Sequence, residues 1–426
     1  MPSEQRGPDY WLFLEPFVHI AESDDAVLLY NALNGKRFEI RIASPAGRIA
    51  GQLSLPENAY VYGLSEEDLH NPDNEKFVGK LKRYFMGDLL ETRWSVGKPA
   101  NFFPEPYFKS HLTKENLSKP EIRDTIDFND YIHEAVIYLN SFPPDPADPF
   151  DGAVNQFVFP GSTVSPIISI PWTLLEPFVH HLTEYRISQI QLSGSDIRKY
   201  PELLMLIEKL AGAHIPVQAH ILSAHFDPGF ASKVLAPRKN RLSIHFTFPI
   251  SGRDFDEILV SLSEKGLLAS THFHFTVTST EELDAAREII RITHLQNAFL
   301  NPFFNGKNFD FFRRIVFLTR KDIRSSRPSQ HQVFSRKAIN ETNFGIFTLL
   351  PDGMLYANLN DRETGNISLQ SLEESILKEI TEGVSWFRTR QTVSPCSRCL
   401  YRFLCPPVSA YEIVTGRFNF CDIFEV

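Results

Sequence analysis

Four cysteines near the end of the chain have the spacing that points most directly to chemistry. They follow the pattern Cys396-x2-Cys399-x5-Cys405, with fifteen residues between Cys405 and Cys421, and the 426-residue chain contains no other cysteine. A CxxC pair brings two sulfurs close enough to share a metal, and two further thiolates complete a tetrahedral set. Ligand type alone suits Zn²⁺ and a [4Fe–4S] cluster equally well. The spacing therefore predicts a metal site, with four unligated thiols as the alternative.

Histidines on expected strands form a second group of candidate ligands. The group consists of His220, His245, His272 and His274. His272 and His274 are two residues apart, so their side chains leave the same side of a strand. If that side is a barrel interior, the histidines could bind a metal and support a hydrolase or transferase. A packed interior in which each imidazole has a hydrogen-bond partner is favoured, because no carboxylate accompanies the set at ligand spacing.

Three shorter motifs carry weaker signals. Residues 193–196, Ser-Gly-Ser-Asp, have one glycine before a helix, which favours helix capping over an anion-binding loop. The His180-His181 pair lies within an expected helix and is interpreted as surface. Residues 301–306 are interpreted as a plain loop at a strand end, with a peptide groove as the alternative.

The elements that must position these residues alternate between strand and helix over about 150–320. Strands are expected at 155–161, 187–194, 215–222, 242–249, 271–279 and 297–304, with helical stretches between and after them. Serial strand–helix units predict a parallel sheet, as an open (β/α) barrel or a doubly wound sheet. Right-handed crossovers then place the loops at the strand C-termini on one face, where α/β proteins carry their chemistry.

The flanking zones differ in pattern. Up to about residue 98, short aromatic strands surround a hairpin signal at Asn34-Gly35, and helices are expected at 45–53 and around Phe77–Phe85. This pattern predicts a small winged-helix-like module. A proline- and acid-rich linker follows, with one possible helix at 128–138. After about residue 340, a hairpin around Pro351-Asp352-Gly353 and a helix lead into the cysteines.

Charge and hydropathy exclude two classes of partner. The net charge of −9 and the absence of a basic run with interleaved aromatics argue against nucleic acid, whose phosphates are held by clustered Lys and Arg. No run of eighteen uncharged apolar residues and no secretory signal pattern occurs, so no membrane partner is expected and the predicted location is the cytoplasm. The hydrophobic content of 42% is ample for a folded core.

The cysteine segment resembles the auxiliary-cluster (SPASM) domain of radical-SAM peptide maturases. In that domain a CxxCx5C run and one later cysteine hold an outer [4Fe–4S] cluster, and a cysteine four residues after the run serves an inner one. Here that position is Ser409. The resemblance implies one cluster on Cys396, Cys399, Cys405 and Cys421, with the inner cluster lost. The upstream segment LLPDGMLYANLND…TGNIS is similar to the hairpin and Gly-Asn-Ile element of the same domain.

The central zone is similar to a radical-SAM core, but it lacks the cysteines that radical-SAM chemistry requires. Residues 193–196 stand where the family's Gly-Gly-Glu motif holds the amine of SAM, so the match is imperfect. The expected first strand is followed by STVSPIIS, where the family carries CxxxCxxC. Without three thiolates no iron ligates SAM and no reductive cleavage follows. The first zone is similar to the leader-recognition domains of ribosomal peptide (RiPP) biosynthesis, which pair a peptide strand to a sheet edge.

Together these observations predict an α/β pseudo-radical-SAM protein in four parts. They are a winged-helix-like recognition domain at 1–98, a linker at 99–149, a degenerate partial (β/α) barrel at 150–335 and a SPASM-like domain at 336–426. The predicted role is non-catalytic: binding a precursor peptide, a true radical-SAM maturase, or both, with one [4Fe–4S] cluster and no SAM. The alternatives are a metal-dependent enzyme on the barrel histidines and a peptide-binding module stabilised by zinc.

Overall fold

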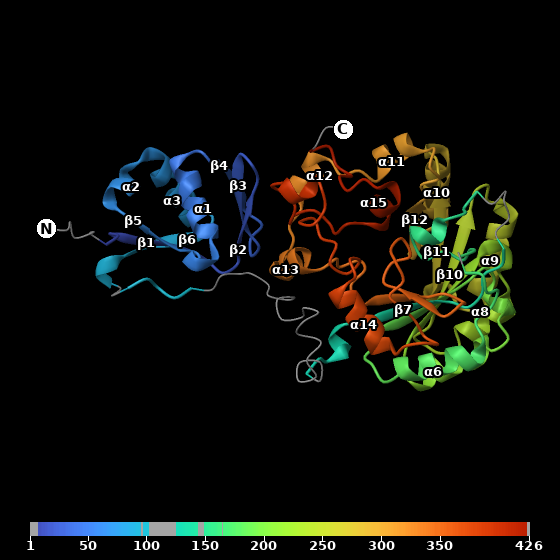
Figure 1. Ribbon diagram of the computed structural model, residues 1–426. Coiled ribbons are helices and arrows are strands. Elements are labelled where there is room, and N and C mark those ends of the chain that lie inside the picture. The colour runs from blue at the N-terminus through green and yellow to red at the C-terminus, as the bar shows by residue number, and fades with distance from the viewer. Residues whose placement is uncertain (1–6, 95–96, 102–124, 144–148, 164, 424–426) are drawn as a thin grey trace.

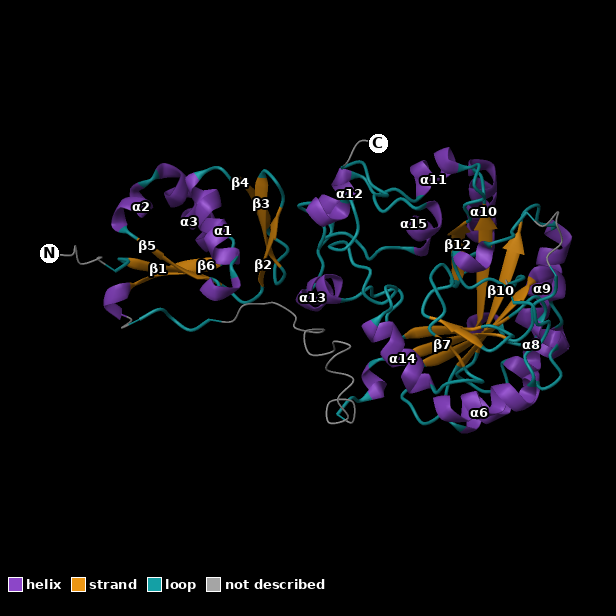
Figure 2. Ribbon diagram, viewed as in Figure 1, coloured by secondary structure: helices purple, strands orange, loops and turns teal. Residues whose placement is uncertain are grey.

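The computed structural model describes residues 7–94, 97–101, 125–143, 149–163 and 165–423. A small N-terminal domain stands beside a larger α/β body, and the C-terminal segment lies between the two (Figure 1). Hairpins and short helices make up the small domain, whereas the larger body is built on one long sheet (Figure 2).

The N-terminal domain contains two three-stranded antiparallel sheets and three helices. One sheet has the order β5-β1-β6 and the other β2-β3-β4. The strands are β1 Tyr10–Leu14, β2 Val18–Glu22, β3 Ala26–Asn31, β4 Arg37–Arg41, β5 Val61–Leu64 and β6 Gly87–Glu91. The helices are α1 Pro45–Ser54, α2 Glu66–His70 and α3 Pro72–Arg83. The predicted hairpin at Asn34-Gly35 is confirmed, because β3 pairs with β4 and Gly35 has φ +72°.

A nine-stranded sheet forms the centre of the larger body. Its order is β12-β11-β10-β9-β8-β7-β13-β14-β15, and every pairing from β12 to β13 is parallel. The strands are β7 Glu134–Tyr138, β8 Gln189–Ser193, β9 Val217–Leu222, β10 Arg241–Thr247, β11 Thr271–Val277, β12 Ala298–Pro302, β13 Ile346–Leu349, β14 Met354–Tyr356 and β15 Gly365–Asn366. The predicted α/β class with a mostly parallel sheet is confirmed. Within the described residues the sheet stays open, because β12 and β15 are its edges.

Helices between the strands cover one face of this sheet (Figure 1). They are α6 Trp172–Leu182, α7 Leu203–Gly212, α8 Pro228–Val234, α9 Gly252–Glu264 and α10 Thr280–Thr293. Their apolar sides and the outward strand residues form the main core, which contains Leu206, Ile244 and Phe275. The remaining helices are α11 Phe309–Ile315, α12 Arg320–Ser325, α13 Gln330–Ala338, α14 Leu372–Thr381 and α15 Ala410–Thr415. No described helix is long and apolar enough to span a bilayer.

The first strand of the sheet is not the predicted one. Residues 134–138, interpreted as part of a helix, form β7 in the middle of the sheet, and the predicted strand at 155–161 is a short 3₁₀ turn followed by loop. The run EAVIY is short and nearly all apolar, and periodicity alone cannot separate a buried strand from a buried helix in such a run. Residues predicted as linker therefore contribute a strand to the sheet.

Candidate functional site

All four cysteines are buried and reduced, and they lie in one region of the C-terminal segment. Cys396 opens a 3₁₀ turn that ends before Cys399, and Cys421 pairs with Leu318 in an isolated β-bridge. Cys399, Cys405 and Cys421 share one buried cluster, and Cys396 packs with Val393 and Val408 beside it.

Burial makes these thiols reluctant to ionise. It raises the pKa of Cys396 to about 11 and that of Cys405 to about 12. The positive charge of Arg390 opposes both shifts. The negative charges of the other three thiolates would raise the pKa of Cys405 further.

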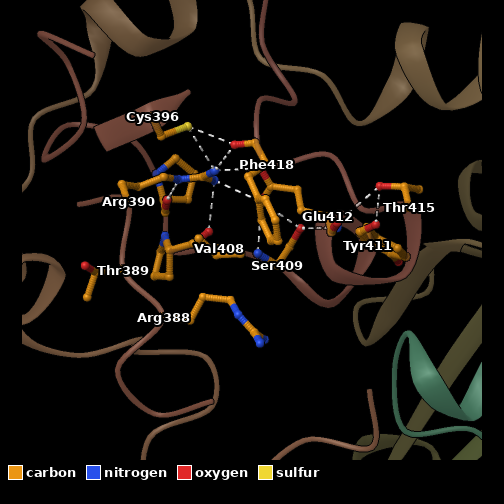
Figure 3. Close-up of polar contacts among 12 residues, drawn as sticks. Arg388, Thr389, Arg390, Cys396, Val408, Ser409, Tyr411, Glu412, Thr415 and Phe418 are labelled. Carbon is orange, nitrogen blue, oxygen red and sulfur yellow. Dashed lines mark hydrogen bonds and ion pairs between the residues drawn. The ribbon is translucent and has the colours of Figure 1, made fainter. Parts of the chain in front are cut away.

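A buried ion pair lies directly beneath Cys396 (Figure 3). Arg390 binds Glu412 through two hydrogen bonds, Nη1 to Oε1 at 2.5 Å and Nη2 to Oε2 at 3.0 Å, and their side chains are only 9% and 2% exposed. Arg390 also donates to three backbone carbonyls, those of Pro406 at 3.0 Å, Pro407 at 3.1 Å and Phe418 at 2.8 Å. One guanidinium thus ties together the segments that follow Cys405 and precede Cys421.

The same guanidinium reaches a cysteine. Arg390 Nη1 lies 3.8 Å from Cys396 Sγ, and the Cys396 thiol donates to the Phe418 carbonyl at 2.8 Å. Near Cys399, the backbone N–H of Tyr401 donates to the sulfur at 3.4 Å. Donors of this kind stabilise the thiolate form that a metal requires.

Ser409 has a capping role in this structure. Its side chain accepts from the Glu412 backbone N–H at the start of α15, and Glu412 accepts from the Ser409 backbone N–H at 2.9 Å. This reciprocal arrangement is a capping box. The carboxylate of Glu412 therefore caps the helix and neutralises Arg390 at the same time.

The donor chemistry fits a metal, whereas the side-chain geometry is not closed around one. Four buried thiols supplied with positive charge and N–H donors are the ligand set of Zn²⁺ or an iron–sulfur cluster. Among the described residues, however, no three His, Cys, Asp or Glu side chains are placed to hold a common ion. Binding would require the sulfurs to turn inward and Cys396 to give up its hydrogen bond to Phe418.

The loop between Cys399 and Cys405 packs against the N-terminal domain. Arg402 Nη1 donates to the Glu22 carbonyl at 2.6 Å, and the Tyr401 hydroxyl donates to Glu39. Ala21, Leu28 and Tyr30 belong to the same buried cluster as three of the cysteines, and their strands face the C-terminal segment (Figure 2). The cysteine region and the sheet β2-β3-β4 are therefore in direct contact.

The candidate histidines gather on the inner face of the parallel sheet, where they bond mainly to amides and to each other. His220 Nε2 lies 2.8 Å from Gln191 Oε1, and His220 Nδ1 lies 3.0 Å from His245 Nε2. His274 stacks on His245 with centroids 4.6 Å apart, and Asn301 Nδ2 lies 3.2 Å from His274 Nδ1. Burial lowers the pKa of each of these three histidines, that of His274 to about 4.

These contacts assign the protons of the neutral rings. Because Gln191 donates to Glu134, its oxygen faces His220 and accepts from Nε2–H. His220 Nδ1 then accepts from His245 Nε2–H, which leaves His245 Nδ1 as a bare acceptor. Within the described structure, His245 Nδ1 and His274 Nε2 have no partner. His220, His245 and His274 thus each have at least one ring nitrogen close to a hydrogen-bond partner, as the packed interior requires.

Phenylalanines pack beside these rings, at the C-terminal ends of the strands. Phe150, Phe157, Phe159 and Phe303 pack there, and Phe159 meets His245 edge-on with centroids 5.6 Å apart. The segment is fixed by the Ser193 hydroxyl, which donates to the Phe159 carbonyl at 3.1 Å. This phenylalanine cluster therefore lies at the end of the sheet where α/β proteins place substrates.

The remaining motifs have structural roles. Asp196 caps the 3₁₀ turn after β8 and binds Arg198 with both oxygens, so the predicted capping role is confirmed. His181, which is partly exposed, has its Nε2 2.7 Å from Glu373 Oε1. Sequence reasoning missed Arg390 and Glu412, although the pattern Ser409-x-x-Glu412 is a capping-box signal visible in the sequence.

Comparison with known proteins gives distant structural likenesses. No family model matches the chain, and neither does any curated protein. A crystal structure of Streptococcus suis SuiB bound to precursor peptide SuiA is 11% identical, with a TM-score of 0.46 over 97% of this chain and 100% of that one. SuiB bound to S-adenosylmethionine gives 11% identity and a TM-score of 0.46 over 96% and 100%. BtrN in complex with AdoMet and 2-DOIA gives 12% and 0.29 over 63% and 92%.

Proposed function

We propose that this chain is a non-catalytic partner in the maturation of a ribosomal peptide, carrying one [4Fe–4S] cluster on Cys396, Cys399, Cys405 and Cys421. The observation that carries the proposal is the confinement of every cysteine to this one buried region. Reductive cleavage of SAM needs three further thiolates, and residues 1–395 contain none. Binding of the cluster would contribute folding free energy to a segment that has little regular structure, because its four ligands would cross-link the chain.

Binding of a precursor peptide is assigned to the N-terminal domain. A groove of about 750 Å³ lies between α1, β5 and α2, with Ile42, Ile49 and Tyr62 among its apolar residues and Glu67 and Asn74 among its polar ones. The strands β2, β4, β5 and β6 are edges of their sheets in the described structure. An extended peptide adds to such an edge through main-chain hydrogen bonds and fills side-chain pockets nearby.

The contact between the two regions gives the proposal its mechanism. The Cys399–Cys405 loop begins and ends at a proposed metal ligand, and it packs against the sheet β2-β3-β4. A bound cluster would order this loop and so hold the recognition domain in place beside the α/β body.

Anaerobic purification tests the cluster. The expected protein is brown, absorbs near ~400 nm and contains iron and sulfide in equal amounts. The variant Cys396→Ser/Cys399→Ser should lose both, whereas Ser397→Ala, a matched change between the two ligands, should retain them. One zinc per chain and no sulfide would instead identify a zinc-stabilised module. Metal retained after all four cysteines become Ala would direct attention to the histidines.

Peptide binding is tested separately. Fluorescently labelled candidate precursor peptides are titrated with the full chain and followed by anisotropy. Saturable binding that is weakened by Tyr62→Ala in the N-terminal groove supports the proposal. Absence of association at high micromolar concentration contradicts it. Release of 5′-deoxyadenosine from SAM by the purified chain alone would refute the non-catalytic assignment.

A further inference from the structure

Polar side chains cross the inner face of the parallel sheet near the N-terminal ends of its strands. The row passes over five neighbouring strands and consists of Glu134, Gln189, Gln218, Arg241 and His272. Interiors of parallel α/β barrels are ordinarily filled by branched apolar side chains at such positions. All five side chains are partly exposed, so this end of the inner face is polar and accessible to solvent.

A cavity of about 630 Å³ opens at this row. It is lined by Gln189, Gln218, Arg238, Lys239, Arg241 and His272. Arg238 and Lys239 are exposed at the rim, and Arg241 is half-buried further in. No carboxylate belongs to the described lining, and none of these three cations forms an ion pair with a described acid. Three positively charged residues thus line one cavity, here called the mouth, in a protein whose net charge is −9.

The donors around the cavity are held in place. Gln189 Nε2 donates to Gln218 Oε1 at 3.1 Å, and Gln218 Nε2 donates to Ser243 Oγ at 2.8 Å. Arg241 Nη1 donates to the Asn240 carbonyl at 2.9 Å, which anchors the guanidinium at the edge of the cavity. A binding group whose donors are already positioned loses little conformational entropy when a ligand arrives.

One member of the row, Glu134, is an acid. Glu134, at the β7 end of the row, accepts a hydrogen bond from Gln191 on the side of the histidines. Burial raises its pKa, although the two glutamine side chains oppose the shift. Glu134 is not among the described residues that line the cavity.

We propose that this mouth binds a small multivalent oxyanion, a phosphate- or polycarboxylate-bearing molecule. The planar donors of Arg238 and Arg241 suit the paired oxygens of such groups, and Lys239 adds a point charge. The site lies at the opposite end of the strands from the phenylalanine cluster and shares no residue with the cysteine region.

Calorimetric titration at constant ionic strength tests the site, with pyrophosphate and citrate as the two probes. One saturable site is expected for at least one probe, and the preferred probe identifies phosphoryl or carboxylate chemistry. The rim variant Arg238→Gln/Lys239→Gln should weaken binding about tenfold or more, since the loss of one charge-assisted contact corresponds to about that factor. Arg241→Gln should weaken it similarly.

A matched control distinguishes binding at this site from a general effect of positive charge on the protein surface. Arg253→Gln removes an exposed cation on α9 and should leave the affinity unchanged. The rim variant lies on exposed positions, so its folding is not at risk and circular dichroism checks it. Equal binding by the rim variant and the wild-type chain, or no saturation by either probe, overturns the proposal.

Discussion

Replacing Arg390 by Met is expected to open the cysteine region locally. The change leaves the Glu412 carboxylate buried at 2% exposure without its counter-charge, and it removes the donor to the carbonyls of Pro406, Pro407 and Phe418. Breaking a buried ion pair by removing one partner costs about 3–5 kcal/mol. Most of that cost should fall on residues 390–421, because every partner of the guanidinium lies there.

Amide hydrogen exchange of the metal-free protein measures this local free energy. Peptides covering 390–421 should exchange faster by a factor that corresponds to the lost local free energy. The exchange rates of peptides from β8 to β11 should be unchanged. Arg388→Met is the matched control, since Arg388 pairs with Asp361 at 2.6 Å at a less buried position. The loss of local stability in Arg388→Met should be smaller, and the exchange rates of the peptides that contain the cysteines should be unchanged.

A double variant distinguishes the ion pair from simple loss of packing. Arg390→Met/Glu412→Leu removes both charges, and apolar replacement of a whole buried pair is often close to neutral. The double variant should therefore recover a large part of the loss caused by Arg390→Met alone. Unchanged exchange in Arg390→Met, or a double variant that loses the sum of both single changes, would refute this reasoning.

Three further changes test other parts of the fold by urea unfolding. His19 is buried with no described partner for either ring nitrogen, and burial lowers its pKa to about 3. In the unfolded state His19 takes up a proton near its ordinary pKa of about 6.5, so the native state loses stability as the pH falls below that value. The variant His19→Phe should remove this loss. Its effect on the free energy of unfolding, relative to the wild-type chain, should therefore be about 2 kcal/mol more stabilising at pH 5 than at pH 8. Tyr30→Phe removes the hydrogen bond to the Pro328 carbonyl at 2.7 Å and should cost about 1 kcal/mol, with increased proteolysis between the N-terminal domain and the rest. Gly194→Ala should cost about 1–3 kcal/mol or more, because Gly194 has φ +148° and an added Cβ would lie 2.6 Å from Asn140 Oδ1.

Short-range pattern in the sequence was enough for much of the fold. Strands β8 to β12 and the helices α7, α9 and α10 were predicted because each carries its own periodicity and turn residues over five or more positions, whereas the short helix α8 was not predicted. The hairpins at Asn34-Gly35 and Pro351-Asp352-Gly353 were equally local. The set of four cysteines and the absence of three further thiolates are read directly from the sequence. They therefore do not depend on which segment forms the first strand of the sheet.

Long-range contacts decided the rest, because they depend on residues that only folding brings together. Residues 134–138 became β7 since a gap between β8 and β13 accepts an apolar strand, and no local signal reports that gap. Arg390 gained its role from carbonyls 16 to 28 residues away. The contact of Arg402 with Glu22 spans 380 residues. The sequence by itself determined which chemical groups are present and which local elements form, and only the tertiary structure decided which of them meet, because burial and charge compensation depend on neighbours in space.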